Sequence, residues 1–307
     1  MTNGKQRPLG VHSLDHFTLA VPDLDAAEKF FRAFGLDVER GAARLYLRCF
    51  GSEHVWADII REQRKKLKSV RFGIFPEDEK AFKERLGPVA ADRPIRALGT
   101  SMWIKAPDGL CVEVAVSGKT SPDEKVECGL PPLYSHARGT GPRSAMGVIR
   151  PRRLAHLALF SKSVPEAISF YQEYLGLRLS DKSGDDVAFM HGPHGSEHHM
   201  VALARSGGPG LHHSSWEVRS IAEVGQGAMQ MEEAGYPSGW GVGRHVLGSN
   251  YFYYARDPWG SYAEFSADMD FIAAGAGWEA LDSPPEDSFY QWGPRPPEDF
   301  GTNYELA

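Results

Sequence analysis

The sequence predicts an α+β protein of two tandem modules, each made of two βαβββ units whose strands form a curved mixed sheet around a cavity. Three observations indicate this: the chain repeats itself at an offset of 140 residues, each copy opens with a strand and a helix, and both copies close alike. We expect a first module over residues 1–120, a linker over 121–152, a second module over 153–272 and an extended tail over 273–307.

The openings of the two copies match along their length. LDHFTLAVPDLDAAEKFFRAFGL and LAHLALFSKSVPEAISFYQEYLGL each begin as a strand and continue with apolar residues at spacings of three and four, typical of a helix packed on a sheet. Gly35 and Gly176 then follow, and glycine commonly ends a helix. The positions that match at the constant offset are Leu14, His16, Leu19, Ala27 and Phe30 with Leu154, His156, Leu159, Ala167 and Phe170.

The closings of the two copies match as well. WIKAPDGLCVEV and YYARDPWGSYAEF both predict a strand, a tight turn of Asp, Pro and Gly, and a second strand. A glutamate falls four residues after the turn glycine in each copy, Glu113 after Gly109 and Glu264 after Gly260. A matched start and a matched end together indicate a duplication.

The segments outside the copies have a different composition. The stretch from about Ser117 to Arg152 is rich in Pro, Gly and charge, which is typical of a linker. The tail is rich in Pro and acidic residues but keeps Phe289, Tyr290 and Trp292. Two interpretations of it stay open: a surface tail, or an arm that packs on a neighbouring chain or roofs a site.

Composition excludes several classes of protein. A formal charge of −6 argues against a nucleic-acid partner, because phosphate binding requires a basic face. The cysteines, Cys49, Cys111 and Cys128, form no CxxC pair and predict neither a disulfide framework nor a cysteine zinc site, so a reducing cytoplasm suits them. The N-terminus has no signal-peptide pattern, and no run of 18 apolar residues occurs. We therefore expect a soluble, cytoplasmic protein with no membrane partner.

Three strands of the second copy each carry a metal-ligand side chain on one face. Because side chains alternate along a strand, His156, His213 and Glu264 are predicted to point into one concavity. The same alternation places His212 on the opposite, apolar face with Trp216. Each of the three alone is more often a structural polar residue, but three buried ionisable groups together are costly without a partner. Two imidazoles and one carboxylate form the facial triad that binds iron(II).

More histidines stand nearby in the sequence. HGPHGSEHHMVALA carries four of them, and for His194 we expect a solvated loop residue without a role in catalysis. His245 precedes Glu264 by nineteen residues, and Tyr254 precedes it by ten.

This ordered pattern resembles the type I extradiol ring-cleaving dioxygenases of the vicinal oxygen chelate superfamily. The segment GRHVLGSNYFYYARDPWGSYAEF is similar to the signature that closes the family's metal site, with His245, Tyr254 and Glu264 at its motif positions. The family's middle metal histidine is usually the second of a pair, so LHH implies His213, and its first ligand lies on the opening strand, which implies His156. The resemblance covers residues 10–270.

The resemblance also implies a catalytic histidine at the start of a strand of the form His-x-apolar-Ala. HMVAL fits with His199, and His198 stays an alternative because the loop to His213 is one residue shorter than the common pattern. What the family implies here is acid–base chemistry by His199, with His245 and Tyr254 hydrogen-bonding the substrate oxygens and helping to remove a proton.

The implied activity is meta-cleavage. A small aromatic diol would be opened beside its two hydroxyls by O₂ at a single Fe(II), with Mn(II) possible because its ligand preferences are similar. The resemblance further implies a homo-oligomer. The first copy keeps His16 and Glu113, but KSVRFGIF has no histidine and Trp103 stands where the second copy has Tyr254, so we expect no metal there.

Two other functions remain as alternatives. A metal-dependent isomerase or lyase of the glyoxalase type usually draws its ligands from two modules or two subunits, which the missing histidine of KSVRFGIF disfavours. A non-catalytic small-molecule binding protein of the same fold would leave His199, His245 and Tyr254 unexplained.

Overall fold

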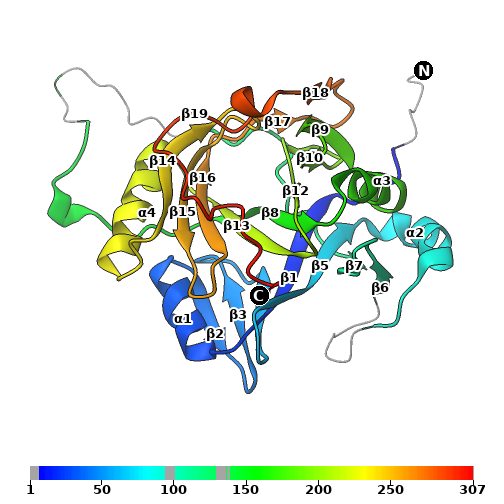
Figure 1. Cartoon of the computed structure of the whole chain (residues 1–307), viewed down its shortest axis with the longest axis horizontal. Coiled ribbons are helices and arrows are strands. Elements are labelled where there is room, and N and C mark those ends of the chain that lie inside the picture. Colours follow the sequence, from blue (N-terminus) through cyan, green and yellow to red (C-terminus); the bar gives the residue numbers. More distant parts are fainter. Residues whose placement is uncertain (1–6, 94–100, 129–135, 137–138, 307) are drawn as a thin grey trace.

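The computed structural model describes residues 7–93, 101–128, 136 and 139–306. Two curved sheets dominate it, one from each half of the chain. In Figure 1 the first half (blue to cyan) lies below, and the strands of the second half (green to orange) curve around a common centre above it. We call β1–β7 the N-terminal module and β8–β19 the C-terminal module. No helix in these described ranges is long and apolar enough to span a membrane.

The N-terminal module is a seven-stranded sheet in the order β2-β3-β4-β1-β5-β7-β6. Its first unit follows the predicted βαβββ order, and in the second, two strands follow the helix within the described residues. Ala90 also forms an isolated bridge with Ile104, and residues 94–100 lie outside the described part. The elements are β1 (Ser13–Val21), α1 (Leu24–Ala33), β2 (Asp37–Arg40), β3 (Arg44–Arg48), β4 (Ala57–Arg61), β5 (Lys66–Ile74), η1 (Pro76–Asp78), α2 (Glu79–Leu86), η2 (Gly87–Val89), β6 (Met102–Lys105) and β7 (Cys111–Val116).

The C-terminal module is a ten-stranded sheet in the order β18-β9-β10-β12-β8-β13-β16-β15-β14-β19. Both of its units follow the predicted βαβββ order, and β11 and β17 form a small separate sheet. The elements, including η3 of the connecting segment, are η3 (Arg143–Ala145), β8 (Arg153–Ser161), α3 (Val164–Leu175), β9 (Arg178–Ser183), β10 (Val187–His191), β11 (Ser196–Glu197), β12 (Val201–Arg205), β13 (Gly210–Glu217), α4 (Ile221–Glu233), β14 (Gly239–His245), β15 (Tyr251–Arg256), β16 (Tyr262–Ala267), β17 (Phe271–Ile272), β18 (Leu281–Asp282), η4 (Pro285–Asp287) and β19 (Tyr290–Trp292).

The first helix of each module starts and ends as the repeat predicts. Asp23 accepts hydrogen bonds from the first backbone N–H groups of α1, and Ser163 does the same for α3. Gly35 and Gly176 follow with φ of 95° and 69°, a conformation that glycine adopts most readily. A Cβ at Gly35 would lie 2.0 Å from the Ile149 carbonyl oxygen, so the glycine also lets the connecting segment pack against α1.

One hydrophobic core joins the two modules. Phe34, after α1, stacks on Phe265 of β16 with ring centroids 3.9 Å apart, and both rings are fully buried. Because strand side chains alternate, burying Phe265 in this core turns Glu264 to the other, concave face of the sheet. The packing between the modules therefore fixes the direction of a candidate ligand.

The tail extends the C-terminal sheet at both of its edges. Strand β18 pairs with β9 at one edge, and β19 pairs with β14 at the other. The red segment in Figure 1 follows this path and then runs down toward the N-terminal module. The tail thus packs on its own chain over most of its described length.

Candidate metal centre and active site

Three side chains from neighbouring strands meet on the concave face of the C-terminal sheet. His156 comes from β8, His213 from β13 and Glu264 from β16, and one ligand atom of each lies within 4.8 Å of the others. The two Nε2 atoms are 3.1 Å apart, and Glu264 Oε2 is 3.3 Å from that of His156 and 3.5 Å from that of His213. All three side chains are buried.

The chemistry of this trio fits a divalent metal ion. Burial raises the pKa of Glu264, but the neighbouring His156 and then the charge of His245 outweigh burial and lower the pKa overall. Among the described residues, Glu264 Oε2 has no hydrogen-bond partner of good geometry. A buried carboxylate oxygen and two imidazole nitrogens so close together need a shared cation, and this donor set with open positions is typical of non-haem iron sites.

The histidine pair of β13 departs from the predicted alternation. Pairing with β8 shifts register between Leu211 and His213, so a β-bulge falls at His212. The expectation that His212 lies on the opposite face from His213 is therefore wrong: their Nδ1 atoms are 2.6 Å apart. His212 Nε2 in turn donates to the Phe300 carbonyl oxygen at 2.9 Å. Burial lowers the pKa of His212 to about 4 and that of His213 well below its usual value.

His198 and His199 differ in what they face. The His199 ring lines the cavity, with its centroid 4.1 Å from that of His156. Its Nδ1 lies 3.0 Å from Nδ1 of His198, whose Nε2 lies 2.7 Å from a carboxylate oxygen of Asp181. Burial, and then the neighbouring His156, hold the pKa of His199 well below its usual value. His198 thus connects His199 to Asp181 from behind the cavity wall.

His245 and Tyr254 form a hydrogen-bonded pair beside Glu264. The Tyr254 hydroxyl lies 2.8 Å from His245 Nε2, and His245 Nδ1 donates to the Phe289 carbonyl oxygen at 2.8 Å. Burial, and then the charge of Glu264, raise the pKa of Tyr254 well above 10. Burial lowers the pKa of His245. Both side chains line the cavity.

Asn250 is a site residue that sequence reasoning missed. Its Nδ2 donates to Glu264 Oε1 at 3.1 Å, and its side chain lines the cavity. The donor occupies the carboxylate oxygen that is not shared with the two histidines, which orients Glu264 Oε2 toward them. The signal was available in GSNYFYY, where a lone amide stands just before an apolar strand next to the Glu264 strand.

The trio lies in a cavity of about 550 Å³. Apolar side chains make most of its wall, among them Phe160, Val187, Phe189, Leu203 and Leu247. Pro285, Ser288, Phe289, Phe300 and Gly301 of the tail also line it. The one Arg or Lys among the described lining residues is Arg205, which is mostly exposed and pairs with Asp186 at 2.5 Å.

His194 does not lie in a solvated loop as expected. It is buried, and its Nε2 donates to the Gly10 carbonyl oxygen at 3.0 Å. The segment before β1 packs against the His-rich loop and removes it from solvent. His194 thus joins the modules, and it is not among the described residues that line the cavity.

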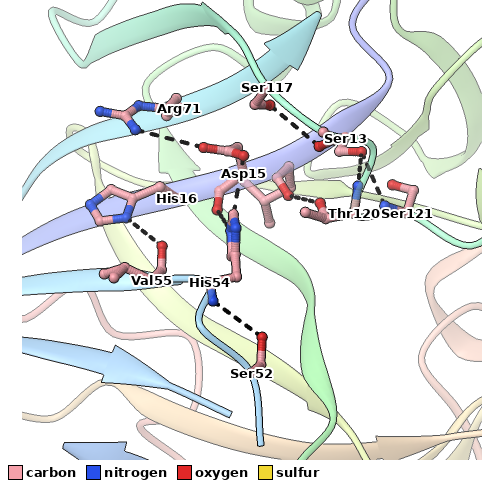
Figure 2. Close-up of polar contacts among 12 residues, drawn as sticks. Ser13, Asp15, His16, Ser52, His54, Val55, Arg71, Ser117, Thr120 and Ser121 are labelled. Carbon is pink, nitrogen blue, oxygen red and sulfur yellow. Dashed lines mark hydrogen bonds and ion pairs between the residues drawn. The ribbon is translucent and has the colours of Figure 1, made fainter. Parts of the chain in front are cut away.

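The N-terminal module lacks the trio at the matching positions. Strand register places Ser69 where the C-terminal module has His213, and Arg71 where it has Ser215. Arg71 Nε lies 2.9 Å from Glu113 Oε2, so a guanidinium pairs with the carboxylate of this module. In Figure 2 Arg71 also reaches toward Asp15, and the Nδ1 of His16 donates to the Val55 carbonyl. The described metal-ligand trio therefore comes from one module, unlike a site shared between modules.

Comparison with known proteins agrees with this geometry. The model of the Glyoxalase/Bleomycin resistance protein/Dioxygenase superfamily matches residues 153–265, which include all three candidate ligands. Metapyrocatechase 2 from Cupriavidus necator is 46% identical over 298 residues, 96% of this chain and 93% of that protein.

Solved structures share the fold over most of the chain. A Mn(II)-bound glyoxalase from Novosphingobium aromaticivorans superposes with a TM-score of 0.75 at 22% identity, over 94% of this chain and 93% of that one. A 2,2',3-trihydroxybiphenyl 1,2-dioxygenase from Sphingomonas wittichii superposes with a TM-score of 0.71 at 22% identity, over 94% of this chain and 100% of that one. The relative that matches nearly end to end decides between these activities: the chain belongs to the type I extradiol ring-cleaving dioxygenases of the vicinal oxygen chelate superfamily.

Proposed function

We propose that this meta-cleaving dioxygenase opens a neutral catechol beside its two hydroxyls, with O₂ as co-substrate, at one Fe(II) held by His156, His213 and Glu264. The observation that carries the proposal is the convergence of these three ligand atoms within 4.8 Å inside a buried, largely apolar cavity. When bound, iron(II) would supply adjacent open positions for two diol oxygens and O₂ and a path for electron density between them.

The chain's own residues hold and move protons around this site. The Phe289 carbonyl accepts the Nδ1 proton of His245, which leaves the one lone pair of His245 Nε2 as an acceptor. Without substrate it accepts from the Tyr254 hydroxyl, and a diol hydroxyl can take that place when substrate binds. Tyr254 places its hydroxyl at the same point, where it can bond a substrate oxygen. We assign to this pair the binding of the diol and the removal of one of its protons.

His199 acts from the side of the site where His156 lies. It lies beside His156 at the cavity wall, and His198 with Asp181 holds its Nδ1 side. Its Nε2 is then the atom available to take or return a proton as the ring opens. His198 has both nitrogens engaged in that contact, which favours His199 over His198 as the acid–base group.

The cavity wall favours a neutral catechol with an apolar substituent. A carboxylated catechol would bring a negative charge into the cavity. Among the described lining residues, the one Arg or Lys is Arg205, which is exposed and already paired with Asp186. Burying an unpaired carboxylate costs several kcal/mol. The name of the curated relative, metapyrocatechase, also indicates catechol as the parent compound.

A substrate screen tests this proposal. The apo enzyme is loaded with Fe(II) without oxygen, and catechol, alkylcatechols, dihydroxybiphenyl, protocatechuate and homoprotocatechuate are then compared by the absorbance of the yellow ring-opened product. We expect kcat/KM for the neutral compounds to exceed that for the carboxylated ones by about 10²-fold or more. A preference for a carboxylated catechol would contradict the proposed substrate class. Loading with Mn(II) in parallel tests the choice of metal.

We propose that the enzyme forms a homo-oligomer, as its resemblance to the family implies. Sedimentation that gives only monomer would contradict this. We place it in the cytoplasm, where the described cysteines would stay reduced, and Cys49 is buried and free. Cell fractionation tests that location.

A further inference from the structure

We propose that the C-terminal tail, from Trp278 to Glu305, fixes which nitrogen of the active-site imidazoles carries the proton and thereby presents a lone pair of His213 to the metal. This inference rests on the proposed function, because it assigns His213 as a ligand. It makes the tail a part of the metal centre and gives His212 a role as a positioning residue.

The main relay runs from Phe300 through His212 to His213. A carbonyl oxygen only accepts hydrogen bonds, so the 2.9 Å contact with Phe300 requires the proton of His212 on Nε2. His212 Nδ1 is then an acceptor, and the His213 Nδ1 atom 2.6 Å away must donate to it. His213 Nε2, the atom facing His156 and Glu264, is left with its lone pair.

The other end of the relay requires the same proton positions. An imidazole that binds a metal through Nε2 carries its remaining proton on Nδ1, and a fixed acceptor for that proton orients the ring. The β-bulge at His212 brings the acceptor to the metal side of the strand. Without the bulge, alternation would point His212 away, and the tail could not reach His213 through it.

The tail also contacts His245 directly and reaches His199 through Asp181 and His198. The Phe289 carbonyl takes the Nδ1 proton of His245 at 2.8 Å. The Leu281 N–H donates to Asp181 at 2.7 Å, and Asp181 accepts from His198, which backs His199. Each tail contact uses a backbone group, so it depends on the path of the tail more than on its side chains.

The end of the tail is anchored firmly enough to hold such a relay. Glu305 accepts hydrogen bonds from the backbone N–H groups of Leu67 and Leu211, each at 2.9 Å, and pairs with Lys65 at 3.1 Å. Both charged side chains are almost fully buried. Asp299, next to Phe300, pairs with Arg256. These contacts fix the tail to both modules on either side of the Phe300 carbonyl.

The experiment measures the Fe(II) dissociation constant directly, by anaerobic competition with a chelator, and does not depend on turnover. His212→Phe removes the acceptor and should weaken iron binding by about 10–100-fold. His212→Asn keeps an acceptor near the position of Nδ1 and should restore most of the affinity. The matched control is His194→Phe, a buried histidine that also bonds a backbone carbonyl but lies outside the cavity lining. It should bind iron as the native enzyme does.

Each outcome decides a different point. Native affinity in His212→Phe, with iron lost in His213→Ala, would overturn this inference and leave the proposed function standing. Iron retained in His213→Ala would overturn the proposed ligand set itself. If His212→Phe does not fold, ¹⁵N imidazole spectra of the native apo enzyme decide instead: protons on His212 Nε2 and His213 Nδ1 support the relay, and the reverse positions overturn it.

Discussion

The two modules have the same fold, and each buries a histidine and a glutamate at matching strand positions. The charge of the buried glutamate is nevertheless compensated in a different way in each module. His16 and Glu113 occupy the strand positions of His156 and Glu264. In the N-terminal module Arg71 supplies a fixed cation 2.9 Å from Glu113. The C-terminal module has Ser215 at that position, and its concavity is left to a cation from solution.

This difference shows how little of the fold must change to make or remove a metal site. A guanidinium and a divalent metal ion both satisfy a buried carboxylate, but only the metal also offers open positions to a substrate. Ser69 stands at the position of His213 and offers no imidazole, and Arg71 pairs with Glu113. The N-terminal module therefore carries an internal ion pair where the C-terminal module carries the candidate metal ligands.

The largest effect is expected from the ligands themselves. His156→Ala, His213→Ala or Glu264→Ala should each lower iron content from about one equivalent per chain to nearly none, because a facial triad has no spare protein ligand. His16→Ala and Glu113→Ala are the matched changes in the other module and should leave iron content unchanged. Metal analysis of the purified variants checks this. Two equivalents per native chain, or normal iron in Glu264→Ala, would contradict it.

The next largest effect separates catalysis from metal binding. His199→Phe, His245→Phe and Tyr254→Phe should keep iron and lose turnover by about 10²–10⁴-fold, as expected when a positioned acid–base group is removed. Trp103 lies opposite Glu113 in the strand register, as Tyr254 lies opposite Glu264. Trp103→Phe is therefore the control and should not change the rate. Loss of metal in His199→Phe would make it a ligand. Full activity there with loss in His198→Phe would reverse the assignment of the pair.

A smaller effect tests the ion pair that replaces the metal. Arg71→Met leaves Glu113 buried without its cation and should lower the free energy of unfolding by about 3 kcal/mol, the low end of the range for broken buried pairs, because Arg71 is partly exposed. Arg71→Met combined with Glu113→Gln should recover most of that loss. Denaturant unfolding of the two variants checks it. Equal destabilisation by the single and double changes would show that the pair does not compensate Glu113.

The features of the fold and of the candidate site that follow from regular periodicity could be predicted from the sequence alone. The repeat, the strand–helix openings and the inward direction of His156, His213 and Glu264 follow from periods of two and of three to four residues. The bulge at His212 does not, because one inserted residue breaks the alternation without a mark in the residue types. Asn250 and the path of the tail depend on contacts between distant segments, such as Phe300 with His212, which no local pattern encodes.

The smallest expected effect is a loss of folding stability at low pH, and it should arise mainly from the C-terminal module. Burial, and then Arg178, lower the pKa of His191 to about 4, and its Nδ1 donates to Ser180. The folded state therefore keeps His191 neutral, while the unfolded chain takes up a proton below a pKa of about 6.5. The contribution of His191 to the free energy of unfolding is complete above pH 6.5 and is lost as the pH falls toward 4.

Replacing His191 with a residue that does not titrate isolates this contribution. His191→Asn keeps an N–H donor for Ser180. Between pH 7.5 and pH 5.5 its free energy of unfolding should fall by about 1 kcal/mol less than that of the unchanged chain. The reason is that only the chain with His191 takes up this proton on unfolding in that range. Urea unfolding at both pH values, at one protein concentration and with the metal removed, measures the difference. The metal must be absent because its own pH-dependent binding would add to the slope. Parallel pH profiles for the two proteins would show that His191 is not held neutral in the fold, and the acid sensitivity would then belong to other groups.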